Sequence, residues 1–339
     1  MKSNNSVAVS IPIHNWTPYL KAVLGSLKVQ SAQLEIAVMM THEDPRILED
    51  LNNSGLKFHY TRIGPDKGQA AAIAEGWENT QSPVLAWLNT DDVLTGNILP
   101  TIISAFNETP NLDVIYGHST ISNEKGTIVG RHPAVHSISP LLRRTNIISQ
   151  PSCFFRRRAV TAVGGLNQKL QFTMDWDLWL RLFENDSRFL FSDHIFSNVT
   201  WAQQTKTASL NWQRLREFGM ILRRTQSLYK TAVGLSAIIR ENRSTYKSNQ
   251  DITENCLTLN ATPQPMTLPV VNMHMDSKFE LEIDHEEKDI TVVIDAVEAE
   301  IITNRHQTKI KFAKAKKPGE AAILSIQGDF THIHNLQWL

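Results

Sequence analysis

Over its first two hundred residues the chain alternates short apolar runs with longer mixed segments. The apolar runs have the length of strands and lie at 7–13, 35–40, 57–63 and 83–89. The segments between them carry apolar residues at helical spacing, as in the alanine-rich segment 67–80. This alternation is typical of parallel strands joined by helices, so it predicts an α/β fold with its ligands at the carboxyl ends of the strands.

The pattern of apolar residues changes after a polar segment, which we interpret as a linker at 241–251. Beyond it, apolar and alternating runs of strand length are separated by turn residues such as Pro318 and Gly319. The sequence therefore predicts an α/β domain with C-terminal helices at 1–240 and a small all-β, sandwich-like domain at 252–339.

Charge and cysteine content exclude several classes of protein. Lys plus Arg and Asp plus Glu are balanced at 34 each, so there is no overall field to attract nucleic acid. The two cysteines, Cys153 and Cys256, are too few for a disulfide framework. No apolar run approaches the roughly 18 to 20 residues that span a bilayer, and the N-terminus does not have the pattern of a signal peptide. We expect a cytoplasmic protein whose membrane contact, if any, is peripheral.

Two adjacent carboxylates, Asp91 and Asp92, follow the apolar run 83–89. At the carboxyl end of a buried strand they would face a cleft, and such oxygen ligands suit Mg²⁺ or Mn²⁺ bridging a diphosphate. The alternative is an ordinary turn, because Asp is common after strands.

Five collinear segments decide between these alternatives: VSIPIHNWTPYL, GPDKGQAAAIAEG, VLAWLNTDDVL, QPSCFFRRRAVTAVGGLNQKL and MDWDLWLRL. In this order and spacing they resemble the family 2 glycosyltransferases, which have the GT-A fold, over about residues 7–205. The resemblance implies a nucleotide-sugar-binding sheet with flanking helices. It also implies a nucleoside-diphosphate-sugar donor and a Mn²⁺ or Mg²⁺ ion held by Asp92 and Asp91.

The resemblance further implies which residues contact the donor: Pro12, Ile13, Asp66, Lys67, Gly68, Asp91 and Gln150. Asp66 would face the nucleotide, and Gly68 would let the backbone approach it closely. A helix-entry turn is an equally good explanation of Gly68, and Lys67 is more simply a solvated charge.

The last segment supplies a second pair of carboxylates, Asp175 and Asp177. By the resemblance Asp175 is the general base that takes the proton of the acceptor hydroxyl. Asp177 would be structural, in the first turn of a helix that begins near Trp176. Trp176 itself is either a contact for the acceptor or a sugar, or a core tryptophan.

The sequence departs from the family pattern at three places. Met39 and Met40 stand where a base-reading Asp is usual, and Asp44 comes only later. Ala74 replaces an Asn, and Ala202 replaces a His that follows the base. These departures keep a second hypothesis open, a non-catalytic nucleotide- or glycan-binding protein on a degenerate GT-A fold.

We expect a metal-dependent, inverting glycosyltransferase that acts on a glycan or lipid-linked saccharide acceptor and binds no nucleic acid. The segment 211–240 is either an interfacial helix or a packed helix with a solvated basic face that includes Arg223 and Arg224. The arginine run 156–158 favours a solvated face over contact with an acidic lipid or a diphosphate.

Overall fold

The computed structural model describes residues 6–122, 126, 128–132, 140–143, 146–200 and 212–225, five positions between 227 and 235, and seven strands between 266 and 338. These residues divide into two compact units. Unit 1 is Met1–Ser122 with Ile148–Thr200, and unit 2 is Asn123–Ile147 with Trp201–Leu339.

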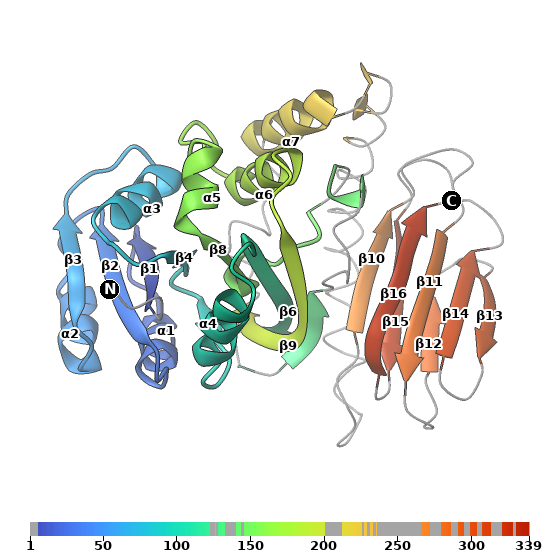
Figure 1. Ribbon diagram of the computed structural model, residues 1–339, viewed down its shortest axis with the longest axis horizontal. Coiled ribbons are helices and arrows are strands. Elements are labelled where there is room, and N and C mark those ends of the chain that lie inside the picture. Colours follow the sequence, from blue (N-terminus) through green and yellow to red (C-terminus); the bar gives the residue numbers. More distant parts are fainter. Residues whose placement is uncertain are drawn as a thin grey trace. The chain divides into compact units, whose positions relative to one another are not determined.

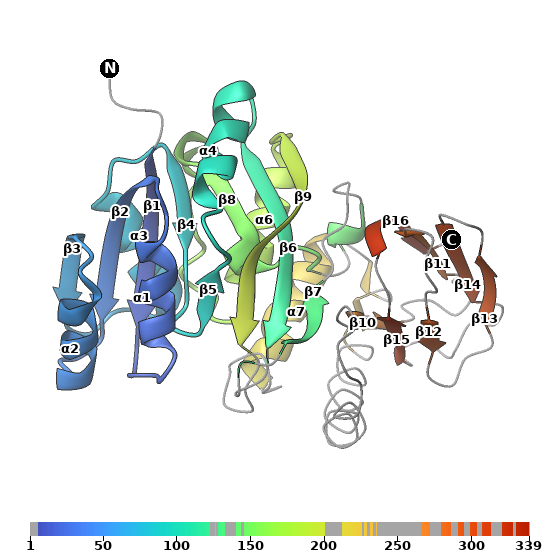
Figure 2. The same cartoon turned by 90° about the horizontal axis from the view of Figure 1, so that it is seen from below.

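Unit 1 is built on one mixed sheet with the strand order β3-β2-β1-β4-β8-β6-β9-β5 (Figure 1). Its strands are β1 (Ser6–Ile13), β2 (Gln33–Met40), β3 (Phe58–Ile63), β4 (Val84–Trp87), β5 (Asp92–Leu94), β6 (Val114–Ser122), β8 (Cys153–Arg156) and β9 (Phe189–Thr200). The first four strands pair in parallel, β8 is antiparallel to β4 and β6, and β9 runs parallel to β6 (Figure 2).

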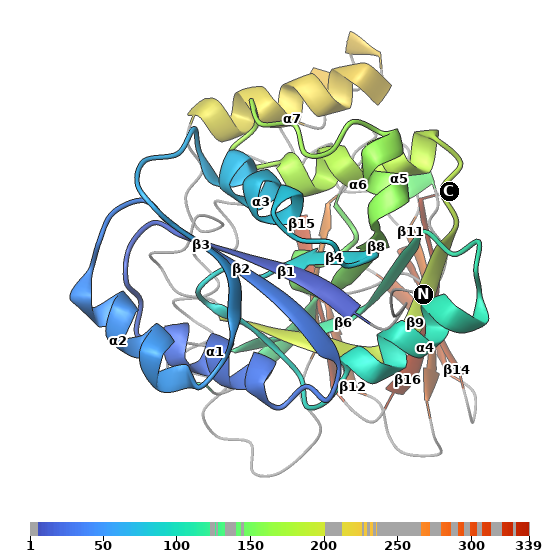
Figure 3. The same cartoon turned by 60° about the vertical axis from the view of Figure 1, so that its left-hand side comes forward.

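Helices cover both faces of this sheet (Figure 3). One layer contains α1 (Leu20–Lys28), α2 (Pro45–Ser54) and α4 (Leu99–Glu108), and the other contains α3 (Gln69–Glu78), α5 (Arg157–Ala162) and α6 (Met174–Glu184). Because both faces are covered, the central strands β1 and β4 are buried almost along their whole length, which explains their continuous apolar runs. The predicted α/β sheet with flanking helices is confirmed.

An aromatic cluster joins the sheet to the second helix layer. Trp87 of β4 lies 5.7 Å, ring centre to ring centre, from Trp77 of α3 and 5.8 Å from Trp179 of α6. Phe155 of β8 contacts both Trp77 and Trp179, at 5.4 and 5.6 Å. Buried aromatic pairs of this kind contribute about 0.5 to 1.5 kcal/mol each beyond the area they bury. The cluster therefore fixes α3 and α6 on the strand that carries the two aspartates at its end.

Unit 2 contains β7 (Ile128–His132), the 3₁₀ turn Pro140–Arg143, α7 (Trp212–Thr225) and seven further strands. Those strands form two antiparallel sheets with the orders β10-β15-β12 and β13-β14-β11-β16. They are β10 (Met266–Val271), β11 (Phe279–His285), β12 (Thr291–Ile294), β13 (Ala299–Thr303), β14 (Gln307–Phe312), β15 (Ala321–Gln327) and β16 (Phe330–Trp338).

The strands of unit 2 fall largely where the apolar runs predict them. The strands β12 and β13 lie in different sheets, and Pro269 interrupts the apolar pattern of β10. The all-β domain at 252–339 stays a prediction, and the linker at 241–251 lies outside the described residues. In the part of the chain that the structure describes, no helix has the length and hydropathy needed to cross a bilayer.

Candidate functional site

The candidate site lies at the carboxyl edge of the sheet, where β1, β2, β3 and β4 end in neighbouring loops. The loop after β1 is tied to the loop after β4, because the Thr17 hydroxyl donates to the Thr90 carbonyl at 3.0 Å. Parallel strands bring their carboxyl ends to one edge, so segments that are distant in the sequence meet here.

Asp92 is the first residue of β5 and its side chain turns inward. It is 4% exposed, and one carboxylate oxygen accepts a hydrogen bond from the Asn89 side chain at 2.9 Å. Burial, and next the negative charge of Asp91, raise the pKa of Asp92 to about 8, although the Asn89 bond acts in the opposite direction. Asp91 is only partly buried. The pair is thus one buried and one more accessible carboxylate.

Side-chain amides from three segments surround Asp92. Asn89 accepts from Gln69 at 2.6 Å and donates to Gln150 at 3.2 Å, and Gln150 donates to the Trp87 carbonyl at 2.8 Å. The network joins the start of α3, the loop after β4 and the 3₁₀ turn Gln150–Ser152. Gln150 was predicted at the site, whereas Asn89 and Gln69 were missed even though both lie within the motifs that carry the family resemblance.

The loop before α3 is held by Asp66. One of its carboxylate oxygens accepts from the Gly68 backbone at 2.8 Å, and the other pairs with Arg62 at 3.4 Å. Gly68 caps the helix with a φ of +113°, and a Cβ at this position would meet nothing within 4 Å. The helix-entry turn is therefore sufficient to explain this glycine. Lys67 is exposed.

Arg62 is a further residue that the sequence did not single out. Its guanidinium donates to Glu75 of α3 at 3.0 Å and to the Met40 carbonyl at 3.2 Å, besides the Gly64 carbonyl. It therefore ties the end of β3 to the end of β2 and to α3.

The end of β2 offers no carboxylate to a nucleobase. Met39 and Met40 are both fully buried, because β2 is covered on both faces. Asp44, the next acid, caps α2 by accepting from the Arg46 backbone at 2.9 Å, and hydrogen bonding to Arg46 lowers the pKa of Asp44 to about 2. The structure thus gives Asp44 a capping role.

The ends of β1 contribute backbone rather than side chains. Ile13 is buried and its carbonyl accepts from the Thr41 backbone at 3.1 Å, while Pro12 is partly buried. Their predicted contact with a donor remains a prediction.

Asp175 and Asp177 both lie in the first turn of α6, which begins at Met174. This corrects the expected helix start near Trp176, because Thr173 already accepts the first helical hydrogen bond, from Asp177, at 2.9 Å. Asp177 is buried and pairs with Arg181 one turn later at 2.8 Å, which supports a structural role.

Asp175 is partly exposed. Burial, and next the charge of Asp175, raise the pKa of the Cys153 thiol, so the carboxylate is near the start of β8. Cys153 directly follows the turn whose Gln150 side chain contacts Asn89. That Asp175 shares a site with Asp91 and Asp92 remains a prediction.

The Trp176 ring is 1% exposed. The predicted contact with an acceptor or sugar is corrected by this burial, because stacking requires an exposed ring face. The alternative, a core tryptophan, is what the structure contains.

Among the described residues no group of three or more His, Cys, Asp and Glu side chains is arranged to hold a metal. Any cation at this edge would rest on Asp91 and Asp92 together with oxygens from a ligand.

Comparisons with known proteins relate the chain to glycosyltransferases. Residues 8–163 match the model of the family described as glycosyl transferase family 2. Uncharacterized glycosyltransferases of Rickettsia conorii and Rickettsia prowazekii are 26% and 27% identical to the chain, over 52% and 60% of its length. The matched parts are 31% and 66% of those two proteins, so the chain spans less than two thirds of either relative.

A solved structure shows a similar fold. Residues 1–349 of TarS from S. aureus, in complex with UDP-GlcNAc, superpose with a TM-score of 0.51 at 13% identity, covering 75% of this chain and 76% of that one. At this identity the likeness concerns the fold alone, and it agrees with the predicted GT-A-type sheet.

Proposed function

Residues 8–163 form a domain of glycosyl transferase family 2, and from this premise we propose that the chain transfers a sugar from a nucleoside-diphosphate-sugar to a hydroxyl of a glycan or lipid-linked saccharide. The observation that carries the proposal is the buried carboxylate of Asp92 at the carboxyl end of β4, beside Asp91 and bonded to an amide network that joins Asn89, Gln69 and Gln150. The UDP-GlcNAc bound by TarS, which shares the fold, supports a nucleotide-sugar as the donor class.

The donor would lie over the carboxyl ends of β1 and β4. Asp66, Lys67, Gly68 and Gln150 border this edge, and Lys67 is exposed and free to approach a phosphate. Base recognition would rest on backbone groups, because Met39 and Met40 are buried.

A divalent cation fits the donor set. Asp92 is a buried carboxylate whose pKa is raised, and a cation beside Asp91 and Asp92 would relieve both the burial cost and their mutual repulsion. Mg²⁺ or Mn²⁺ would neutralise the charge that develops on the leaving diphosphate. Asp92 would hold the cation together with Asp91, the more accessible of the two carboxylates.

Asp175 would act as the general base. A partly exposed carboxylate on a helix held rigidly by Trp179 can take the proton of an acceptor hydroxyl as the new bond forms. One base and one stabilised leaving group suffice for a single displacement, so transfer would invert the anomeric centre.

The second candidate is a nucleotide- or glycan-binding protein without catalysis. It is favoured by the absence of a base-reading acid at Met40 and of any third metal-ligating side chain in the described residues. Both candidates predict binding of a nucleoside diphosphate, and only the first predicts turnover.

Release of nucleoside diphosphate from a panel of donor sugars, with Mn²⁺ or with excess chelator, separates the two. We expect release that needs the metal and is largely lost in Asp92→Asn. Binding is measured separately by thermal shift, since a ligand at about 100 times its Kd adds roughly 2.7 kcal/mol to the free energy of unfolding. Stabilisation without release for every donor would favour the binding protein, and full release in chelator would contradict the metal site.

A further inference from the structure

A cavity of about 750 Å³ lies at the opposite edge of the sheet from the candidate site. Pro83, which lines it, immediately precedes β4, whereas Asn89 follows the end of this strand. Four strand residues rise about 13 Å at roughly 3.3 Å each, so the cavity is separate from the region of Asp91 and Asp92. Its volume is in the range of roughly 300 to 1,000 Å³ that is usual for small-molecule sites.

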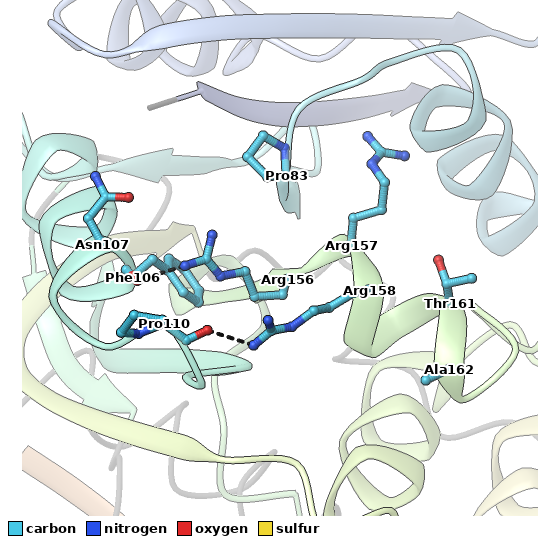
Figure 4. Close-up of a pocket in the computed structure, with 9 residues that line it drawn as sticks. All are labelled: Pro83, Phe106, Asn107, Pro110, Arg156, Arg157, Arg158, Thr161 and Ala162. Carbon is cyan, nitrogen blue, oxygen red and sulfur yellow. Dashed lines mark hydrogen bonds between the residues drawn. The ribbon is translucent and has the colours of Figure 1, made fainter. Parts of the chain in front are cut away.

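The arginine run 156–158 lines this cavity together with residues at the end of α4 (Figure 4). Each arginine binds a different segment. Arg156 donates to the Phe106 carbonyl at 2.6 Å, Arg157 donates to the Ser82 carbonyl at 2.9 Å, and Arg158 donates to the Pro110 carbonyl at 2.8 Å. The predicted solvated face is therefore corrected at Arg156, which is drawn inward and is 8% exposed.

Arg156 is a buried cation with few partners. Its guanidinium carbon lies 4.7 Å from the centre of the Phe106 ring, and of the three guanidinium nitrogens only Nη2 donates to a described residue. Its Nε is buried without a hydrogen-bond partner. Burial, and next the charge of Arg158, lower the pKa of Arg156, which reports the same shortage of compensating charge.

Positive charge exceeds negative charge around the cavity. Three guanidiniums line it, and the carboxylates that act on them are Asp113, paired with Arg158 at 3.2 Å, and Glu35, which acts on Arg157. An oxyanion beside Arg156 and Arg158 would offset this surplus, and guanidinium donors match the geometry of phosphate and carboxylate oxygens.

The remaining lining is largely apolar. Phe106, Pro83, Pro110 and Ala162 line the cavity with the arginines (Figure 4). A free inorganic anion would leave these surfaces in water, whereas a ligand with an apolar chain would bury them, at roughly 25 cal/mol per Å².

We infer that this cavity binds an anionic amphiphile, an oxyanion joined to a short apolar chain. The oxyanion contacts Arg156 and Arg158, and the chain packs on Phe106 and the two prolines. The site is independent of the proposed transfer reaction, since it uses none of the residues at the other edge of the sheet.

Isothermal titration of the full chain tests the inference with three probes: n-hexyl phosphate, inorganic phosphate and 1-hexanol. Excess chelator is present throughout, so that no divalent cation draws phosphate to Asp91 and Asp92. We expect n-hexyl phosphate to bind at least ten-fold more tightly than either inorganic phosphate or 1-hexanol, because only it satisfies both the charge and the apolar lining.

Two variants locate the binding. Arg158→Gln should weaken n-hexyl phosphate at least five-fold and leave 1-hexanol unchanged, and Ala162→Trp should weaken both by filling the cavity from its exposed rim. Arg46→Gln is the matched control, because Arg46 is as exposed as Arg158 (62% and 58%) and is likewise paired with an aspartate, but lies outside the cavity. Thermal melting of each variant checks that it is folded.

Equal affinity for n-hexyl and inorganic phosphate would overturn the inference in favour of a plain anion site. Absence of binding, or binding that Arg46→Gln weakens as much as Arg158→Gln, would also overturn it. Loss of donor turnover in the metal assay has no bearing on this result, because the two experiments use different residues and opposite metal conditions.

Discussion

The two ends of β4 lie near buried charges of opposite sign. The carboxylate of Asp92 is buried near the carboxyl end of this strand, and the guanidinium of Arg156 is buried near its amino end. Asp92 receives one hydrogen bond, from the neutral side chain of Asn89, and its pKa is raised. The Arg156 guanidinium donates one hydrogen bond to a described residue, to a carbonyl in the last turn of α4, where the helix dipole is negative. Neither charge is fully compensated within unit 1. The two edges of this sheet therefore suit ligands of opposite charge.

The surroundings of the two charges also differ. Neutral amides that are bonded to one another frame Asp92, so the acidic edge is polar and ordered. Prolines, an alanine and the Phe106 ring frame the basic edge. A metal with a diphosphate suits the first surroundings, and a ligand with an apolar part suits the second.

The largest effect is expected from removing the proposed base, Asp175. Asp175→Asn should lower the rate of transfer by about 10² to 10⁴-fold, because the acceptor hydroxyl keeps its proton as the bond forms. Donor binding and the melting temperature should stay near those of the parent protein. The measurements are steady-state transfer and a thermal shift with the donor, and Asp177→Asn is the matched control on the same helix turn. Normal turnover in Asp175→Asn and a folded but inactive Asp177→Asn would reverse the assignment of the pair.

The pH dependence of stability tests the buried charge of Asp92. Its pKa is raised from 3.8 to about 8 in the folded chain, so between these values the folded state holds more protons than the unfolded state. The free energy of unfolding therefore falls as pH rises through this window, by at most about 1.4 kcal/mol per pH unit from this group. Asp92→Asn removes the effect.

Denaturant unfolding at pH 5 and pH 8, in the presence of chelator, measures this change in the free energy of unfolding. We expect Asp92→Asn to gain stability relative to the parent at pH 8 compared with pH 5. An identical difference at both values would show that Asp92 is not a buried, uncompensated carboxylate.

At the basic edge, Arg157 and Arg158 should contribute differently to the free energy of unfolding. Arg157 donates to Trp77, Ser82 and Thr80, which lie in or just after the last turn of α3, whereas Arg158 is exposed. Arg157→Ala should lower the free energy of unfolding by about 2 to 3 kcal/mol through the lost charge-assisted hydrogen bonds. Arg158→Ala should cost less than about 1 kcal/mol, as exposed ion pairs usually do. Equal losses in denaturant unfolding would contradict the difference in their contacts.

A small effect is also expected from the buried ion pair on α6. Asp177→Asn weakens the bond to Arg181, whose side chain is 21% exposed, and should lower the free energy of unfolding by about 1 kcal/mol after screening by solvent. The melting temperature measures this loss. A drop as large as that of Arg157→Ala would mean that α6 depends on the pair more than on Trp179.

The strands and helices of unit 1, and the edge at which the acids lie, follow from the sequence. The apolar runs ending at Ile13, Met40, Ile63 and Leu88 are those of β1 to β4, because strand and helix periods are local properties of the chain. Asp91 and Asp92 could be placed at the carboxyl end of β4 because they directly follow its apolar run, whereas Gln150, which precedes the antiparallel strand β8, was named by the family resemblance. Residues inside the same motifs, such as Asn89, were overlooked because an amide has no distinctive pattern.

Which side chains are buried, and which groups they bind, depends on how distant elements pack together. Trp176 and Arg156 have nothing in their local sequence that sets their exposure, yet both are buried in the folded chain. The deciding contacts join residues far apart in the chain, such as Gln150 with Asn89, 61 positions away, and Arg156 with Phe106, 50 positions away. Periodicity reports the face of one element, whereas hydrogen-bond partners and burial depend on where the other elements pack. For this reason the sequence determined the fold and the acidic edge, and the packing alone produced the buried charges at the two ends of β4.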